Sequence, residues 1–149
     1  KYDARRLGPS PGANLLESMW NALNIALFVF HTALILFNIF GWMWPPTRRW
    51  NLLTLGLTIF SWVVMGFWKG AGYCICTDWH WQVRHQMGIA ESADSYIILL
   101  ARTLFGWDPP VSTANSIALG FLIVSVIGSV IMNLRDFRRA KATAEISEI

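Results

Sequence analysis

Three stretches of this chain lack Asp, Glu, Lys and Arg over lengths that suit a lipid bilayer: Ser18–Thr47, Trp50–Trp68 and Val111–Leu134. About 20 apolar residues in a helix cross the ~30 Å hydrocarbon core. A charge at the centre of the bilayer costs about 2.5–3.5 kcal/mol or more, so spans exclude charged residues. The sequence therefore predicts an all-α membrane protein with three spans, over about 19–44, 50–68 and 111–134.

The rest of the chain separates the spans and flanks them. Residues 1–18 contain two prolines and two glycines, and we expect an extended N-terminal arm there. Pro45 and Pro46 leave only a short turn between the first two spans, which predicts a transmembrane hairpin. Residues 69–110 are expected to hold one or two short interfacial helices, and 135–149 a basic C-terminal tail.

The basic residues predict an orientation. Arg48 and Arg49 follow the first span directly, and Arg135, Arg138, Arg139 and Lys141 follow the third. Basic residues close to span ends favour the cytoplasmic side. We therefore expect the C-terminus in the cytoplasm and the cysteine-containing loop outside it. The expected surroundings are a lipid bilayer and protein partners in a membrane complex, not a nucleic acid.

Polar residues on the first span form the most informative pattern. Asn24, His31 and Asn38 are seven residues apart and share one helix face. The second span offers a matching set: Thr54, Thr58 and Ser61. One interpretation is an interhelical hydrogen-bond ladder, in which each bond contributes about 0.6 kcal/mol. The alternative makes His31 an axial ligand to haem or to a chlorophyll-type magnesium.

Cys74 and Cys76 form a second candidate site. Two cysteines separated by one residue form a strained disulfide and match no familiar zinc spacing, even with His80 and His85 nearby. Small apolar residues at a helix end are one interpretation, and a thiol redox pair in an oxidising compartment is another. Asp78 with His80 offers acid–base chemistry. No complete catalytic or metal-binding set is present, and the sequence identifies no cofactor.

The segment around these cysteines mixes aromatic and basic residues, as is typical of a membrane interface. Its interfacial residues are Trp79, His80, Trp81, Arg84 and His85. A different surface is expected on the third span, where Ser116, Gly120 and Gly128 are small and Val124 lies between them. Small residues allow two helices to approach closely, so this stripe predicts a helix–helix contact.

The order of these sequence motifs resembles that in a family of small bacterial inner-membrane proteins, which is classed as a domain of unknown function. The likeness rests on the segment from His31 to Asn38, on Gly41-Trp42, and on Gly72-Tyr73-Cys74 followed by Thr77-Asp78-Trp79-His80-Trp81. It covers about Leu23 to Met87, with weaker agreement through the last span. The resemblance implies a multi-span helical fold in the bacterial inner membrane and no particular activity.

These observations lead to a first functional hypothesis. Long apolar spans without a complete catalytic set favour a small non-catalytic subunit that packs on a larger membrane assembly, such as a respiratory or photosynthetic complex. The first alternative is a cofactor-binding protein that uses His31. The second is a membrane enzyme with redox or lipid chemistry at Cys74, Cys76, Asp78 and His80.

Overall fold

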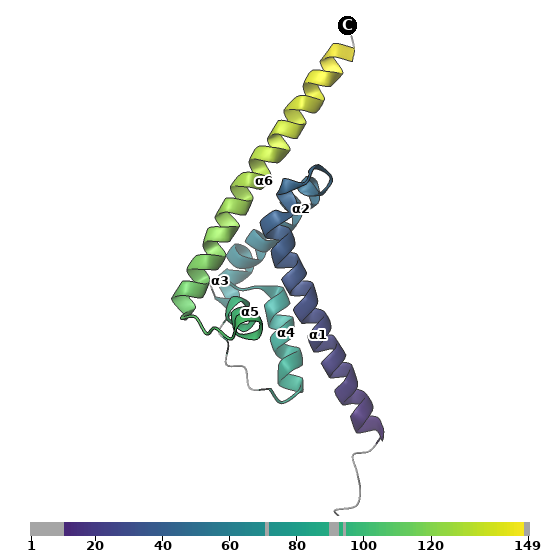
Figure 1. Cartoon of the computed structure of the whole chain (residues 1–149), viewed down its shortest axis with the longest axis vertical. Helices are drawn as coiled ribbons and strands as arrows, with labels where there is room; N and C mark the ends of the chain where they lie inside the picture. Colours follow the sequence, from purple (N-terminus) through teal and green to yellow (C-terminus); the bar gives the residue numbers. More distant parts are fainter. Residues whose placement is uncertain (1–10, 71, 90–92, 94, 148–149) are drawn as a thin grey trace, which may run out of the picture.

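The computed structural model describes residues 11–70, 72–89, 93 and 95–147, and every regular element in this part of the chain is helical. Two long helices, α1 (Pro11–Phe40) and α6 (Val111–Ser147), come together beside the turn between α1 and α2 and diverge away from it (Figure 1). Three helical segments are long and apolar enough to cross a membrane: Asn14–Met43, Pro45–Lys69 and Val111–Ile146. The chain is therefore a multi-pass helical membrane protein.

A tight turn joins the first two spans. It contains two short 3-10 segments, η2 (Gly41–Met43) and η3 (Pro45–Thr47). The Thr47 hydroxyl donates a hydrogen bond to the Gly41 carbonyl at 2.6 Å. Gly41 is buried, and a Cβ there would lie 3.0 Å from the Asn51 amide nitrogen and 3.0 Å from the Phe37 ring. Only glycine leaves room for the second helix to return this close to the first.

The second span is not one regular α-helix. It consists of α2 (Arg48–Phe60), a π-helical segment η4 (Ser61–Met65), and α3 (Gly66–Lys69), which ends at Gly70 with φ +106°. Such π segments insert a residue into the helix and occur often at functional sites. Here the segment begins at Ser61, whose hydroxyl donates to the Tyr73 carbonyl at 3.0 Å. The irregular turn therefore holds the loop that follows the span.

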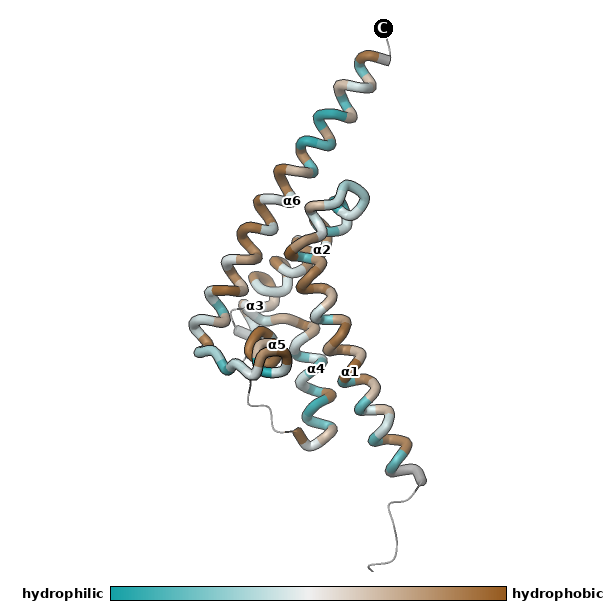
Figure 2. Tube along the Cα trace, viewed as in Figure 1, coloured by the Kyte–Doolittle hydropathy of each residue, from teal (hydrophilic) through white to brown (hydrophobic). Residues whose placement is uncertain are grey.

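Two shorter helices, α4 (Ile75–Gln86) and α5 (Tyr96–Phe105), fill the space between the diverging ends of α1 and α6 (Figure 1). Helix α5 lies across the long axis of the molecule, and its residues are mostly hydrophobic, whereas those of α4 are mixed (Figure 2). The Ser95 hydroxyl accepts a hydrogen bond from the Ile98 amide, and Gly106 ends α5 with φ +64°. A small core joins α5 to the start of α6 and consists of Ala93, Tyr96, Ile98, Leu99 and Ala114.

The two chain ends differ from the sequence expectation. The expected extended arm over 1–18 is wrong from Pro11 onward, because α1 begins there and proline suits the first helical turn; residues 1–10 lie outside the described part. The basic tail continues α6 as far as Ser147 instead of leaving it. Residues 135–147 contain no Gly or Pro and are rich in Ala, Arg and Lys, which favour helix.

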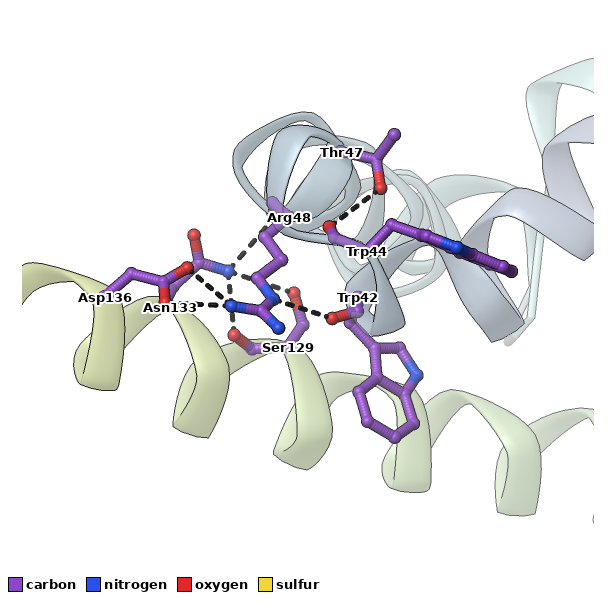
Figure 3. Close-up of polar contacts among 7 residues, drawn as sticks. All are labelled: Trp42, Trp44, Thr47, Arg48, Ser129, Asn133 and Asp136. Carbon is purple, nitrogen blue, oxygen red and sulfur yellow. Dashed lines mark hydrogen bonds and ion pairs between the residues drawn. The ribbon is translucent and has the colours of Figure 1, made fainter.

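A polar cluster fastens the hairpin to α6 (Figure 3). The Arg48 guanidinium donates to both carboxylate oxygens of Asp136, at 2.8 and 2.9 Å, and to the Trp42 carbonyl at 3.1 Å. The Asn133 amide donates to the Arg48 carbonyl and to the Ser129 carbonyl. These contacts set the position of the hairpin turn along the axis of α6.

Candidate thiol–imidazole site

The polar face of α1 contacts α4 and α2. The amide oxygen of Asn24 lies 2.8 Å from His80 Nε2 on α4. His31 Nε2 lies 3.6 Å from the Cys74 sulfur, at the start of α4. Asn38 faces α2, where its amide donates to Thr58 at 3.0 Å and its oxygen accepts from Thr54 at 2.7 Å. Asn38 therefore joins α1 to the second span, and Asn24 joins α1 to α4 two turns beyond His31 on the same face.

Tyr96 covers the imidazole of His31. Their ring centroids are 3.9 Å apart, and His31 is only 6% exposed. The Tyr96 hydroxyl donates to the Phe28 carbonyl at 2.7 Å and lies 2.9 Å from the Thr32 hydroxyl, so α1 holds this ring in place. Among the described residues, His31 Nδ1 is buried and has no hydrogen-bond partner. When Nε2 of a neutral imidazole is the donor, Nδ1 is an acceptor, and here that acceptor is unused.

The loop before α4 places Cys74 beside His31. The Ser61 hydroxyl donates a hydrogen bond to the Tyr73 carbonyl and accepts one from the Ile75 amide at 3.4 Å. Tyr73 and Ile75 are the two chain neighbours of Cys74, so these hydrogen bonds hold the backbone on both sides of it. Cys74 itself is the extended N-cap residue of α4, with φ −122° and ψ 120°. The sequence places Ser61 among helix-packing residues, whereas the structure places it against this loop. Ser61 thus hydrogen-bonds to the backbone on both sides of Cys74.

The surroundings of Cys74 favour its thiolate form. The neighbouring Cys76 thiol lowers the pKa of Cys74, burial opposes this, and the contact with His31 lowers the pKa further. The neighbouring Cys74 and burial raise the pKa of Cys76. The two thiols therefore differ in their surroundings, because the Cys74 sulfur has the contact with His31.

The other candidate residues of α4 lie on two faces of the helix. Asp78 accepts hydrogen bonds from the Tyr73 hydroxyl and from the Gln82 amide, both at 3.0 Å, and His80 is 1% exposed beside Asn24. Trp79 points outward and is 54% exposed. The Arg84 guanidinium lies over the Trp81 ring at 5.9 Å, and His85 lines a shallow cavity of about 360 Å³ with Trp81.

The small residues of α6 separate into two groups. A Cβ on Gly128 would lie 3.0 Å from the Trp42 indole, whereas a Cβ on Gly120 would have no neighbour within 4 Å. Ser116 is exposed. Twelve residues turn an α-helix through about 120° beyond whole turns, so Ser116 and Gly128 cannot share one narrow face. Only Gly128 packs against the hairpin.

A haem or chlorophyll-type group does not fit at His31. Imidazole binds such a metal through a ring nitrogen with open space in front of it. His31 Nε2 is directed at Cys74, and the Tyr96 ring lies against the imidazole. Within the described residues, no group of three or more His, Cys, Asp or Glu side chains is arranged to hold a metal ion.

The family model of a protein of unknown function, DUF2784, matches residues 21–134. This chain belongs to the DUF2784 family. The match contains the second span, most of the first and third spans and the whole thiol–imidazole site, and it leaves out the start of α1 and the end of α6. No curated protein and no solved structure matches the chain.

Sequence reasoning singled out His31 and Cys74 separately but did not join them, because they are 43 positions apart in the chain. Tyr96 was missed altogether. It belongs to a short apolar run, and nothing in that run distinguishes a ring that covers an imidazole from one that faces lipid. Three aromatic contacts around it, with Phe28, His31 and His80, mark it only in the folded structure.

Proposed function

We propose that this DUF2784 protein carries out thiol–disulfide exchange at the outer side of a bacterial inner membrane, with Cys74 as the attacking thiol and Cys76 as the resolving thiol. The observation that carries the proposal is the contact of the Cys74 sulfur with His31 Nε2 at 3.6 Å. An imidazole that donates to sulfur stabilises the thiolate, which is the reactive form. The adjacent Cys76 supplies the second sulfur that exchange requires.

The chemistry balances with a disulfide as the second reactant. The Cys74 thiolate attacks one sulfur of a substrate disulfide, forms a mixed disulfide and releases the first substrate thiolate. That thiolate takes the Cys76 proton, and the Cys76 sulfur then attacks Cys74 and expels the second thiolate. The substrate disulfide is reduced to two thiols, and the cysteine pair is oxidised to a disulfide. Because Cys-X-Cys disulfides are strained, the oxidised pair in turn oxidises other thiols readily.

The location rests on charge. Arg48 and Arg49 begin α2 at one end of the second span, beside the basic residues after Leu134, whereas Cys74 follows the other end of that span, at the start of α4 (Figure 1). The positive-inside rule favours that end for the cytoplasm and places Cys74 toward the oxidising outer compartment, where disulfide chemistry operates. A membrane-impermeant thiol reagent on intact cells tests this location by labelling Cys74 or Cys76.

Cys76→Ser in the full-length protein provides the test of mechanism, with glutathione disulfide as the probe. We expect a mixed disulfide between Cys74 and glutathione to accumulate in this variant, because the resolving thiol is absent. The wild-type protein should instead pass on to the Cys74–Cys76 disulfide, and intact-protein mass spectrometry distinguishes the two adducts. Cys74→Ser is the matched control and should gain neither adduct at a comparable rate. An equal rate of glutathione addition at Cys76 in that control refutes the assignment of Cys74 as the attacking thiol.

A second candidate, a subunit of a larger membrane complex, has an observation of its own. Helix α6 continues past its last polar contact with the hairpin at Asp136 and stands clear of the other helices (Figure 1). Phe137 is 70% exposed on this segment. Isolated helices of about 12 residues are marginal in water. A partner that packs on this extension of α6, or on its lipid-facing side, would stabilise it.

Gly120→Leu tests the subunit candidate without disturbing the fold, because Gly120 has no neighbour within 4 Å. A partner helix packed on the lipid-facing side of α6 at Gly120 would be pushed away by the larger leucine side chain. We expect wild-type protein extracted in gentle detergent to migrate as a larger complex in native sizing, and the variant to migrate as the free chain. Wild-type protein that is monomeric in every gentle detergent contradicts this candidate.

A further inference from the structure

A cationic face begins where the apolar part of α6 ends. Arg135, Arg138 and Arg139 follow Leu134 and are all exposed. They are separated by three and four residues, which places them on one side of the helix. The Arg49 side chain, at the start of α2, is exposed at the same end of the molecule.

The one carboxylate within this basic run is already engaged. Asp136 follows Arg135 but is rotated by about 100° around the helix, toward the hairpin. There it accepts both hydrogen bonds from Arg48, whose side chain is only 14% exposed (Figure 3). In the described part of the chain, none of the four exposed arginines has an ion pair. Arg48 thus neutralises Asp136, and the positive charge of the cationic face is left without a paired carboxylate.

The height of this face coincides with the membrane surface. The Arg48 contacts with Asp136 and with the Trp42 carbonyl tie the hairpin turn to this level of α6. Trp44 and Trp50 flank the turn, and they are 58% and 66% exposed. Exposed tryptophans next to apolar spans lie preferentially at the headgroup level. Guanidinium groups at that depth meet lipid phosphates.

We infer that Arg135, Arg138 and Arg139, together with Arg49, form a binding site for the headgroups of anionic phospholipids in the leaflet at this end of the protein. The guanidinium fork matches phosphate oxygens in pairs, and α6 presents three such forks on adjacent positions. Each basic group near an anionic surface strengthens binding about fivefold. This site is independent of the thiol–imidazole site.

The experiment uses the full chain in nanodiscs that contain three parts phosphatidylcholine to one part phosphatidylglycerol. After detergent exchange, native mass spectrometry counts the lipids that remain bound. We expect wild-type protein to retain phosphatidylglycerol well above its bulk share, and the triple variant R135Q/R138Q/R139Q to lose that enrichment by about tenfold or more. The control K69Q/R84Q/R102Q removes three positive charges from α3, α4 and α5, outside this face, and should retain the enrichment.

Two further arms keep the test decisive. The variant R135K/R138K/R139K preserves charge and should keep most of the enrichment, which also covers the case in which the glutamine variant fails to fold. Addition of 50 mM inorganic phosphate, a free anion, should not displace the bound lipid. Equal enrichment in the wild type and the glutamine variant, an equal loss in the control, or full displacement by phosphate would each overturn the assignment.

Discussion

Cys74 in the folded protein should react with iodoacetamide at nearly its full rate even at pH 6.5. A thiol with the usual pKa of about 8.5 is only about 1% ionised at that pH, so its rate falls roughly a hundredfold below the plateau. The hydrogen bonds from Cys76 and His31 lower the pKa of Cys74. The thiolate is therefore present from the lowered pKa upward, and raising the pH from 6.5 to 9 adds little.

Two variants identify the cause. Cys76→Ala removes one of these hydrogen-bond donors and His31→Leu the other, so the midpoint of the Cys74 rate profile should rise in both. At pH 6.5 we expect the Cys76→Ala rate to fall by about tenfold or more. Peptide mass spectrometry after timed alkylation reads Cys74 and Cys76 separately, and protein unfolded in SDS supplies the ordinary thiol profile. A folded wild-type profile that follows the unfolded one would refute thiolate stabilisation, and with it the basis of the proposed exchange reaction.

Gly128→Leu should destabilise the helical bundle strongly, whereas Gly120→Leu should leave it unchanged. The added Cβ at position 128 lies 3.0 Å from the Trp42 indole, and the remaining leucine atoms cannot fit without moving α6 away from the hairpin. Overpacking of this kind costs about 1–3 kcal/mol. The shift would also pull Asp136 away from Arg48, which adds to the loss.

The same substitution at Gly120 is a matched control, because it places an equal apolar volume on the lipid-facing side of α6. Thermal unfolding in one detergent, followed by tryptophan fluorescence, compares the two. Trp42→Ala in the Gly128→Leu background should recover part of the lost stability, since it removes the clashing ring. Equal unfolding temperatures for the two leucine variants would show that α6 does not pack on Trp42.

A stripe of small residues therefore has to be interpreted position by position. Ser116, Gly120 and Gly128 look equivalent in the sequence, because each is small and spaced by multiples of four. In the structure only Gly128 faces the hairpin. Four-residue spacing drifts by about 40° per step on a helix of 3.6 residues per turn, and over twelve residues the drift carries one end of the stripe off the contact face.

The sequence by itself determined that the chain is a helical membrane protein with three spans. The exclusion of charge from three long segments has a single physical cause, the cost of a charge in hydrocarbon, and that cost acts on each segment separately. The helix ends after α4 and at α5 were equally local, because Gly88 and Gly106 adopt the positive φ that terminates a helix. Such features depend only on neighbouring residues and on the surrounding solvent.

Tertiary structure alone decided the site. The contact between His31 and Cys74 depends on the π-helical segment in the second span, on the hydrogen bond from Ser61 to the loop that follows the span, and on the packing of α4 along α1. Tyr96 reaches the same imidazole from a helix more than sixty residues further along the chain. The local pattern marks each of these side chains as polar or aromatic in an apolar setting. Which of them meet is set by the packing of distant helices, because the need to pair buried polar groups can be met by any partner that the fold brings within reach.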